Sequence, residues 1–383
     1  MSFRITSNMM MNTYRYNLMK STNKLSDARD KVLTQRNFNS FAEDPASATQ
    51  AFRLRQQWYQ TNNQLDNTKA TYNKFHTAWT NLAGTITDLS DANARVSAIR
   101  GNDGTAGESR TALANVLRET ADSVIQSLNQ KVGDQFIFAG NDGLNVPFHW
   151  SEDGKTLYYR GIDVNTQDPD EQAQLKAMAE ERLDLDLGMG MKEVQLADGS
   201  YKVVNGSAFD ASLQGIDFLN YGVDEDGDPQ SLPLIMKELA DVFETWGENG
   251  QMYMHPDYRD KSADEIKEIL NSEDPAVKAE AETIRAYHAE AQAKAYRLMD
   301  KLNAAHAYTS EKYVELDAKA SFLQTNTERL TTQSSNLNEQ VLDIEQVDLA
   351  DAITQFSWDQ YCYSAALKIG NQLLSQSLID YMN

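Results

Sequence analysis

The sequence predicts a mainly α protein with a β-containing insertion. Heptad-spaced apolar residues extend over long stretches at both ends of the chain, and strand-like segments with glycine and asparagine turns lie between them. A chain of 383 residues is too long for one compact core. We therefore expect long antiparallel helices that form a rod, N- and C-terminal helices paired as a coiled coil, and an inserted α+β outer domain.

The first helix is predicted from a seam in which residues recur in alternating steps of three and four, the spacing of a coiled coil. The seam consists of Met11, Tyr14, Leu18, Ser21, Leu25, Ala28 and Val32. The segment TQRNFNSFAEDPASATQ then breaks the helix. We expect Asp44 to cap a second helix and Pro45 to occupy its first turn, because proline lacks the N–H that would be unpaired there.

The second helix is predicted to extend from about residue 45 to the glycine-rich RGNDGTAGES. Its seam consists of Ala51, Leu54, Trp58, Thr61, Leu65, Thr68, Tyr72, Phe75, Trp79, Leu82, Ile86, Leu89, Asn93 and Val96. The four large aromatic residues in this seam are interpreted as core residues, not as a ligand site. A third helix is predicted to carry Leu113, Leu117, Ala121, Val124, Leu128 and Val132 on one face and to stop at Gly133.

The middle of the chain has a different pattern. The segments DQFIFAGNDGLNVPFHW and KTLYYRGIDV are predicted to contain strands, and EVQLADGSYKVV is predicted to be a hairpin that turns at Asp198-Gly199. The segment SLPLIMKELADVFETW is predicted to be helical. We expect residues 146–280 to form a separate inserted domain.

The C-terminal part is predicted to be a helix or a chain of helices from Pro275 onward, because after Pro275 it holds no further proline and, apart from Gly370, no glycine. Its last part carries a heptad-like stripe of Leu349, Ile353, Phe356, Tyr363, Leu367, Leu374, Leu378 and Tyr381. Each large apolar side chain left in water forgoes about 1.5–3 kcal/mol. An ordinary intramolecular bundle would cover part of this stripe, and the remainder favours self-assembly or a partner.

The overall composition excludes several classes of protein. The chain carries 57 acidic and 35 basic residues, a net charge of −22, which repels nucleic acids and anionic lipids. Its one cysteine, Cys362, excludes an intramolecular disulfide. Polar residues interrupt the N-terminal segment where a signal peptide needs an apolar core, and no window has the length of a membrane span. We expect no nucleic-acid partner, no membrane insertion and no cleavable signal.

No residue pattern supports catalysis or a cofactor. The histidines lack metal-ligand spacing; they are His76, His149, His255, His288 and His306. The acidic run Asp224, Glu225, Asp226 and Asp228 does not fit a calcium loop, because its first ligand position would be Gly222 and its twelfth Pro233. We interpret this run as a solvated acidic turn. Neither a phosphate-binding loop nor a nucleophile elbow occurs, so we expect no catalytic, cofactor or metal site.

Three segments resemble the bacterial flagellin and hook-associated protein family. The C-terminal EQVDLADAITQFSWDQYCYSAALKIGNQLLSQSLIDYMN is similar to the closing segment of these proteins, and TQRNFNSFAEDPASATQAFRLR is similar to their turn, usually written SGKRINSPSDDP. FIFAGNDGLNVPF with the downstream LYYRG resembles the β-entry of type 3 hook-associated proteins, the hook-filament junction proteins. Thr34-Gln35 and Glu43 depart from the usual turn, and Ser310-Glu311-Lys312 lacks the usual glycine-x-arginine.

The resemblance implies a flagellin-like fold and a structural adaptor of the flagellum, not an enzyme. It implies a homo-oligomeric ring between hook-associated protein type 1 and flagellin, with the terminal helices of neighbouring copies packed around the export channel. It also implies type III export with a flagellar chaperone on the C-terminal helix, and an extracellular position on the flagellum. The expected subunit and partner interface is Leu18, Leu25 and Val32 of the first helix with the C-terminal stripe.

Three domains are expected from the residue patterns and the resemblance. Residues 1–40 with 345–383 form the terminal coiled-coil domain, 41–145 with 281–344 form the helical rod domain, and 146–280 form the inserted outer domain. Two alternatives to the junction adaptor stay open, one within the family and one from a different class of protein. One is a flagellin-type filament subunit, and the other is a secreted enzyme carried in the inserted domain. A membrane-active effector is a weaker alternative, because residues 349–383 carry one lysine and no arginine.

Overall fold

The chain forms two compact units. The structure, a computed structural model, describes residues 7–100, 107–196, 199, 201–204, 206–247, 255–258 and 261–382, without the side chains of 7–8, 100, 107–109, 245–247, 256, 263 and 373–382. The terminal unit consists of the residues up to Leu65 and from Glu328 onward, and the central unit consists of Asp66–Thr327. The division into three domains that the sequence predicts stays a prediction.

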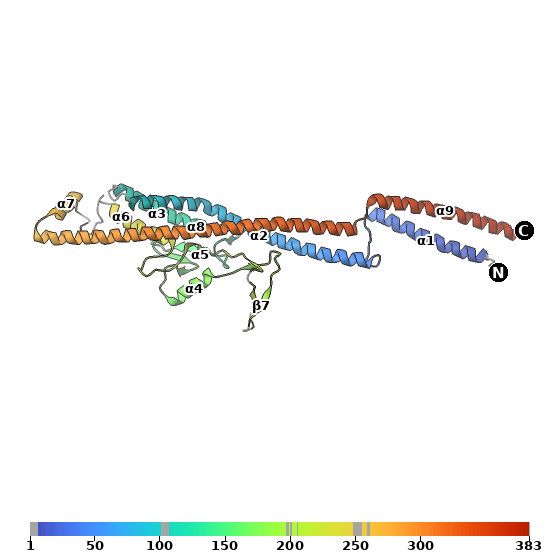
Figure 1. The fold of residues 1–383 in the computed structure, drawn as a ribbon, viewed down its shortest axis with the longest axis horizontal. Helices are drawn as coiled ribbons and strands as arrows, with labels where there is room; N and C mark the ends of the chain where they lie inside the picture. The colour runs from blue at the N-terminus through green and yellow to red at the C-terminus, as the bar shows by residue number, and fades with distance from the viewer. Residues whose placement is uncertain are drawn as a thin grey trace. The chain divides into compact units, whose positions relative to one another are not determined.

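In the terminal unit, the first and last helices pair. Helix α1 (Ser7–Thr34) lies beside helix α9 (Leu349–Met382) and runs in the opposite direction (Figure 1). The start of α2 (Pro45–Arg100) packs against the end of α8 (Pro275–Glu345). Buried Leu65, Leu330 and Val341 belong to this second pair, and the Ser334 hydroxyl hydrogen-bonds Asn62 Oδ1 at 2.7 Å.

The central unit holds the main hydrophobic core. The rest of α2 and α8 packs there with α3 (Gly107–Leu128) and α6 (Leu232–Gly247), and α6 lies along α3. Phe75, Leu117 and Phe243 are among its fully buried side chains. Every residue of the seam predicted for the second helix is buried or half-buried. The mainly α fold predicted from periodicity is therefore confirmed, as is the interpretation of the aromatic seam residues as core.

Short antiparallel sheets occupy the middle of the chain, as the sequence predicts. Strands β1 (Lys131–Val132) and β2 (Gln135–Phe136) pair, as do β6 (Asp184–Leu185) and β9 (Phe209–Asp210). A three-stranded sheet has the order β3 (Phe148–Trp150), β4 (Leu157–Tyr159), β5 (Ile162–Asp163). Phe148 and Tyr159 face each other across this sheet and are both buried, so one face of the sheet joins the core.

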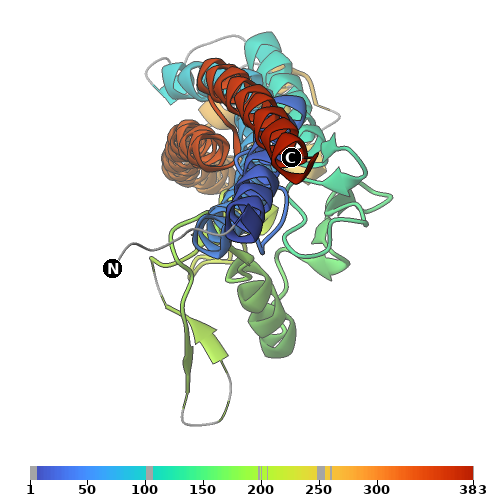
Figure 2. The ribbon, with the colours of Figure 1, turned by 90° about the vertical axis from the view of Figure 1, so that its right-hand side faces the viewer.

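The predicted hairpin is present and stands apart from the core. Strands β7 (Glu193–Gln195) and β8 (Tyr201–Val203) pair antiparallel, and the hairpin extends away from the helices of the central unit (Figure 2). Gly199 has a φ of +85°, as a tight turn requires. Asp198, the other predicted turn residue, lies outside the described residues.

The predicted end of the third helix is wrong by about one turn. Helix α3 ends at Leu128, and Val132 belongs to strand β1. Asn129 explains the difference: its side-chain amide donates to the Phe148 carbonyl at 2.8 Å and accepts from the Phe148 N–H at 3.0 Å. This bond pair draws the chain toward β3. Gly133, with a φ of +60°, then forms the turn between β1 and β2 instead of the helix cap.

Shorter helices lie in the connections of the central unit. They are α4 (Pro169–Ala179), α5 (Gly215–Leu219), the 3₁₀ helix η1 (Pro256–Tyr258) and α7 (Ala263–Asn271). None of the helices in the described part of the chain has the length and apolar character that a membrane crossing requires.

Candidate functional site: the paired terminal helices

The seam predicted for α1 is its packed face. Ala28 is buried, and Met11, Tyr14, Leu18, Ser21, Leu25 and Val32 are half-buried, whereas most residues between them are exposed. Because α9 is the helix that contacts α1, this seam is covered within one chain. Leu18, Leu25 and Val32 are consequently part of the intramolecular helix pair, and their role in a subunit interface stays a prediction.

The packed face of α9 is built largely from small and polar residues. Its least exposed positions again follow steps of four and three: Ala352, Phe356, Asp359, Tyr363, Ala366 and Gly370. The Asp359 carboxylate accepts a hydrogen bond from the Gln355 amide at 2.9 Å. A methyl group placed on Gly370 would overlap the ring of Tyr14. The glycine therefore lets the two helices approach closely at this level.

Helix α1 covers the apolar stripe of α9 only in part. Leu349, Ile353 and Leu367 are 42 %, 48 % and 45 % exposed, because they lie beside the packed face rather than on it. Phe356 and Tyr363 are half-buried. The side chains of Leu374, Leu378 and Tyr381 lie outside the described residues. The stripe is thus covered in part by the chain's own N-terminal helix, and those of its aliphatic side chains that the structure describes, Leu349, Ile353 and Leu367, face outward.

Further large apolar side chains are exposed on both terminal helices. On α1 they are Met9, Met10, Tyr16, Met19 and Leu33, and on α9 they are Trp358, Tyr361 and Ile369. Trp358 and Tyr361 stack on each other with ring centroids 6.1 Å apart. Exposed apolar side chains are thus frequent on both of the paired helices.

A hydrogen-bonded turn joins the two helix pairs of the terminal unit. The Asn37 side chain donates to the Ile344 carbonyl at 3.0 Å and to the Gln346 carbonyl at 2.8 Å. Its backbone N–H donates to the Glu345 carbonyl at 2.8 Å. Carbonyls at a helix end have no partner within the helix, so Asn37 closes the end of α8. Gln35 adopts a left-handed φ of +56° and accepts a bond from the Val347 N–H.

Aspartates begin the two helices that leave this turn. Asp44 accepts a hydrogen bond from the Ser47 N–H at 3.1 Å, and α2 starts at Pro45. Hydrogen bonds from Ser47 hold the pKa of Asp44 below its ordinary value. Asp348 caps the start of α9, where its carboxylate accepts a hydrogen bond from the Ala350 N–H at 2.8 Å. An ion pair between Arg55 and Glu345 joins α2 to the end of α8.

The acidic run in the central unit is ion-paired, so its interpretation as a solvated turn is wrong. Asp228 is 3 % exposed, and the Lys301 ammonium lies 2.6 Å from Asp224, 3.0 Å from Asp226 and 2.5 Å from Asp228. Arg297 Nε lies 2.6 Å from Asp228. One carboxylate oxygen of each of these three aspartates lies within 4.8 Å of the others, close enough to hold a metal ion. The Lys301 ammonium lies among these oxygens and pairs with all three aspartates.

Hydrogen bonding sets the charge state of this loop. Burial acts to raise the pKa of Asp228, but hydrogen bonds from Arg297 and Lys301 outweigh it and hold the pKa below the ordinary value. The opposite holds for Lys301: burial acts to lower its pKa, and its bonds to the three aspartates raise it above the ordinary value. The loop is therefore a fixed ion-pair network that ties residues 224–228 to α8.

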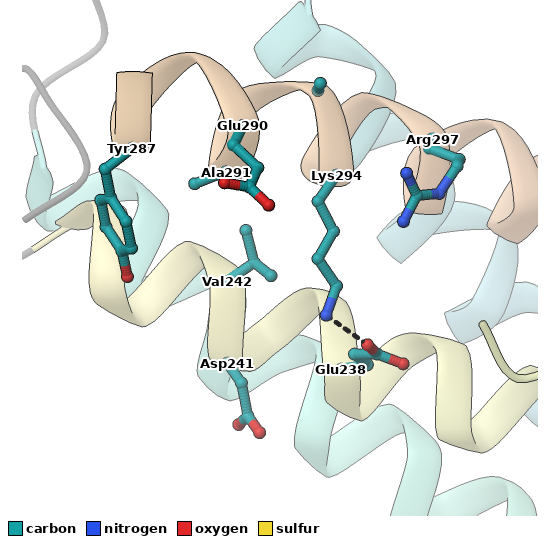
Figure 3. A pocket seen from close by; sticks show the side chains of 9 residues that line it. Glu238, Asp241, Val242, Tyr287, Glu290, Ala291, Lys294 and Arg297 are labelled. Atoms are coloured by element: carbon teal, nitrogen blue, oxygen red, sulfur yellow. Dashed lines mark ion pairs between the residues drawn. The ribbon is translucent and has the colours of Figure 1, made fainter. Parts of the chain in front are cut away.

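A groove with a volume of about 560 Å³ lies between α6 and α8 of the central unit. Figure 3 shows Glu238, Asp241 and Val242 on one side and Glu290, Lys294 and Arg297 on the other. Lys294 and Glu238 pair across it at 2.6 Å. Asp241 and Arg297 pair with Arg118 and Asp228 outside the groove, and the lining lacks a nucleophile next to a base. The groove does not form a recognisable active site.

Several residues with structural roles were missed by the sequence analysis. Asn37 carries no sequence signal, because its partners are more than 300 residues away in the chain. Gly370 does carry one, since it is the single glycine after Pro275. Lys301 could be recognised as the partner of the acidic loop only once the fold had brought the two segments together.

A comparison with known families decides the nature of the C-terminal elements. Residues 299–382 match the family model of the bacterial flagellin C-terminal helical region. This part of the chain is similar to the C-terminal helical region of bacterial flagellins. It includes the end of α8, the turn at Asp348 and helix α9. The matched region thus contains the helix that pairs with α1.

Solved structures of flagellar proteins are also similar to this chain. A flagellar hook-associated protein from Vibrio parahaemolyticus is 12 % identical, with 79 % of this chain and 100 % of that chain covered and a TM-score of 0.45. The flagellar hook-associated protein 3 from Legionella pneumophila is 11 % identical, with 76 % and 98 % covered and a TM-score of 0.44. FlgL from Bacillus cereus is 14 % identical, with 76 % and 99 % covered and a TM-score of 0.36. No curated protein matches the sequence. The assignment of α9 therefore rests on the family match.

Proposed function

We propose that this protein is a structural adaptor of the bacterial flagellum, which assembles as a junction ring between hook-associated protein type 1 and the flagellin filament. The observation that carries the proposal is the outward-facing apolar stripe on α9. This helix belongs to the flagellin C-terminal region, and its Leu349, Ile353 and Leu367 lie exposed next to the packed face. Large aliphatic side chains in this position are stabilised when a neighbouring molecule covers them.

The helix pair by itself offers a modest apolar contact. On the α9 side, Ala352, Ala366 and Gly370 contribute little surface to it, and Asp359 contributes a polar group. Much of the apolar surface of α9 is left for other subunits. In this proposal the terminal helices of adjacent copies complete each other's cores.

The assignment to the junction rather than to the filament rests on the stretch that resembles type 3 hook-associated proteins. Phe136, Ile137, Phe138 and Ala139 of this stretch are buried, and the Tyr159 hydroxyl of the downstream LYYRG donates to the Phe138 carbonyl at 3.2 Å. The two resembling segments are thus joined in one core. The proposed partners are other copies of this chain, hook-associated protein type 1, flagellin and an export chaperone on α9, and the proposed location is the extracellular flagellum.

Deleting the gene in the bacterium that encodes this chain tests the proposal. A junction adaptor predicts cells that carry hooks without filaments and release flagellin into the medium, because the filament has nothing to start on. Restoring the wild-type gene should restore filaments. Deletion cells that still grow filaments of normal length would contradict the junction role.

A flagellin-type filament subunit is the second candidate, because the matched family is named for flagellin itself. It predicts a different result in the same strain: filaments are absent and no filament protein accumulates in the medium. Electron microscopy of the purified chain separates the two further, since a filament subunit forms open-ended polymers and a junction protein forms closed rings.

A further inference from the structure

The terminal unit carries two exposed surfaces of opposite charge. Up to residue 55 the sequence holds nine basic and four acidic residues, although the whole chain has a net charge of −22. Between residues 330 and 367 it holds six acidic residues and no lysine or arginine. The two stretches meet at the turn, where Arg36 forms an antiparallel bridge with Gln346. Opposite charge is therefore concentrated on two parts of the same unit.

The first surface combines basic and aromatic side chains. Phe52 and Tyr59 are 69 % and 62 % exposed, and a spacing of seven residues puts them on one face of α2. Exposed Arg53 flanks them on the same helix, and Arg36 and Phe41 are exposed in the preceding turn. We call these five residues the basic aromatic surface. Aromatic residues and arginine are the types most enriched at protein interfaces.

The second surface combines acidic and aliphatic side chains. Glu339, Leu342 and Asp343 are exposed on the last turns of α8, and Leu349 and Ile353 are exposed on the first turns of α9. We call these five residues the acidic apolar surface. Glu339 and Asp343 form no ion pair with the side chains that the structure describes, and the same is true of Arg53. Each surface thus carries charge that the described side chains of the same chain do not pair with.

We propose that the basic aromatic surface of one copy docks on the acidic apolar surface of the next copy. The charges are complementary, and the Arg55–Glu345 ion pair within one chain shows that the same two stretches already attract each other. The contact is heterologous, joining different surfaces of identical molecules, and such contacts close into rings when the rotation between copies allows it. This inference rests on the proposed junction ring and specifies which parts of neighbouring subunits meet.

Charge reversal with exchange between two variants tests the docking. One variant carries Arg36→Glu and Arg53→Glu, and the other carries Glu339→Lys and Asp343→Lys. Each variant alone should self-associate at least about tenfold more weakly than wild type, because like charges then face each other. A mixture of the two should recover association, since the altered surface of each variant complements the altered surface of the other.

Sedimentation velocity over a concentration series measures these associations. A matched control reverses two exposed charges on the central unit, Lys176→Glu and Lys192→Glu, and should associate like wild type. Thermal melts should agree among all chains, because the reversed side chains are exposed. Variants that associate as well as wild type, a mixture that stays dissociated, or a wild-type chain that stays monomeric at its highest soluble concentration would each overturn the docking. Filament growth in the complemented deletion strain reports on the junction role independently.

Discussion

The ring of Tyr14 in α1 lies against Gly370 in α9, in the space that the side chain of any other residue at 370 would occupy. Gly370 is buried, and it is the single glycine after Pro275. Because a glycine inside a helix destabilises that helix by roughly 0.5–1 kcal/mol relative to alanine, its presence here is offset by the close approach of the two terminal helices. The contact fixes the antiparallel register of the pair.

Gly370→Ala should weaken the terminal helix pair. The gain in helix propensity is about 1 kcal/mol, whereas overpacking of a close contact costs about 1–3 kcal/mol. We expect a net loss of about 1 kcal/mol, which corresponds to an approximately fivefold faster opening of α1. Hydrogen exchange of the amides between residues 11 and 32 measures this opening of α1.

Tyr14→Ala supplies the control for this substitution. In a Tyr14→Ala background the overlap is absent, so Gly370→Ala should be neutral or stabilising. If Gly370→Ala had the same effect in both backgrounds, the contact between Tyr14 and Gly370 would not be the cause.

Asn37→Ala should loosen the turn between the two helix pairs. The substitution removes two hydrogen bonds to the Ile344 and Gln346 carbonyls, a loss of about 1–2 kcal/mol. Amides of residues 345–348 should exchange faster. Asn39→Ala is the matched control, because only the backbone N–H of Asn39 takes part in a bond, to Glu43. Equal exchange in the two variants would show that Asn37 does not close the end of α8.

Lys301→Met should destabilise the central unit and create a response to calcium. The substitution leaves three aspartates without the ammonium group between them, a loss of about 2–4 kcal/mol given that Arg297 still pairs with Asp228. Calcium should raise the melting temperature of this variant and leave that of the wild type unchanged. Lys319→Met removes a surface pair with Glu315 and should cost less than about 0.5 kcal/mol. A calcium response in the wild-type chain would contradict the role given to Lys301.

The same ion-pair network predicts how stability depends on pH. In the folded chain the pKa values of Asp224 and Asp228 lie below their ordinary 3.8, so their contribution is present above pH 3.8 and is lost as the pH falls further. The pKa of Lys301 lies above its ordinary 10.5, so its contribution is lost as the pH rises beyond that value. The free energies of unfolding of wild type and Lys301→Met, measured by chemical denaturation, should differ most between about pH 4 and pH 10. If the difference in unfolding free energy between the two chains stayed constant as the pH fell below about 4, the aspartates would not be the source of this stability.

The helices and their packed faces could be predicted from the sequence because periodicity is a local property. The seam from Met11 to Val32 and the seam from Ala51 to Val96 are both the buried sides of their helices. The end of α3 was predicted too late, since a tertiary hydrogen bond pair between Asn129 and Phe148 overrides the local signal.

The candidate site was less predictable. On α9 the stripe of large aliphatic residues and the packed face are different sides of the helix, because close approach at Gly370 selects small residues such as Ala352 and Ala366 for the contact. Size and hydrophobicity alone therefore pointed to the outward side. The partners of the acidic loop were unpredictable for a related reason: Lys301 lies more than 70 residues away in the chain and is brought to Asp228 by folding.

The outward stripe of α9 serves assembly in the proposed function, and sedimentation velocity of one triple variant measures that role. Leu349→Gln, Ile353→Gln and Leu367→Gln change side chains that are exposed in the single chain, so the monomer should melt within about 0.5 kcal/mol of wild type. Assembly of this variant should weaken at least about tenfold, because each lost apolar contact is worth more than 1 kcal/mol when it is fully covered. A triple variant that assembles as the wild type does would contradict the account.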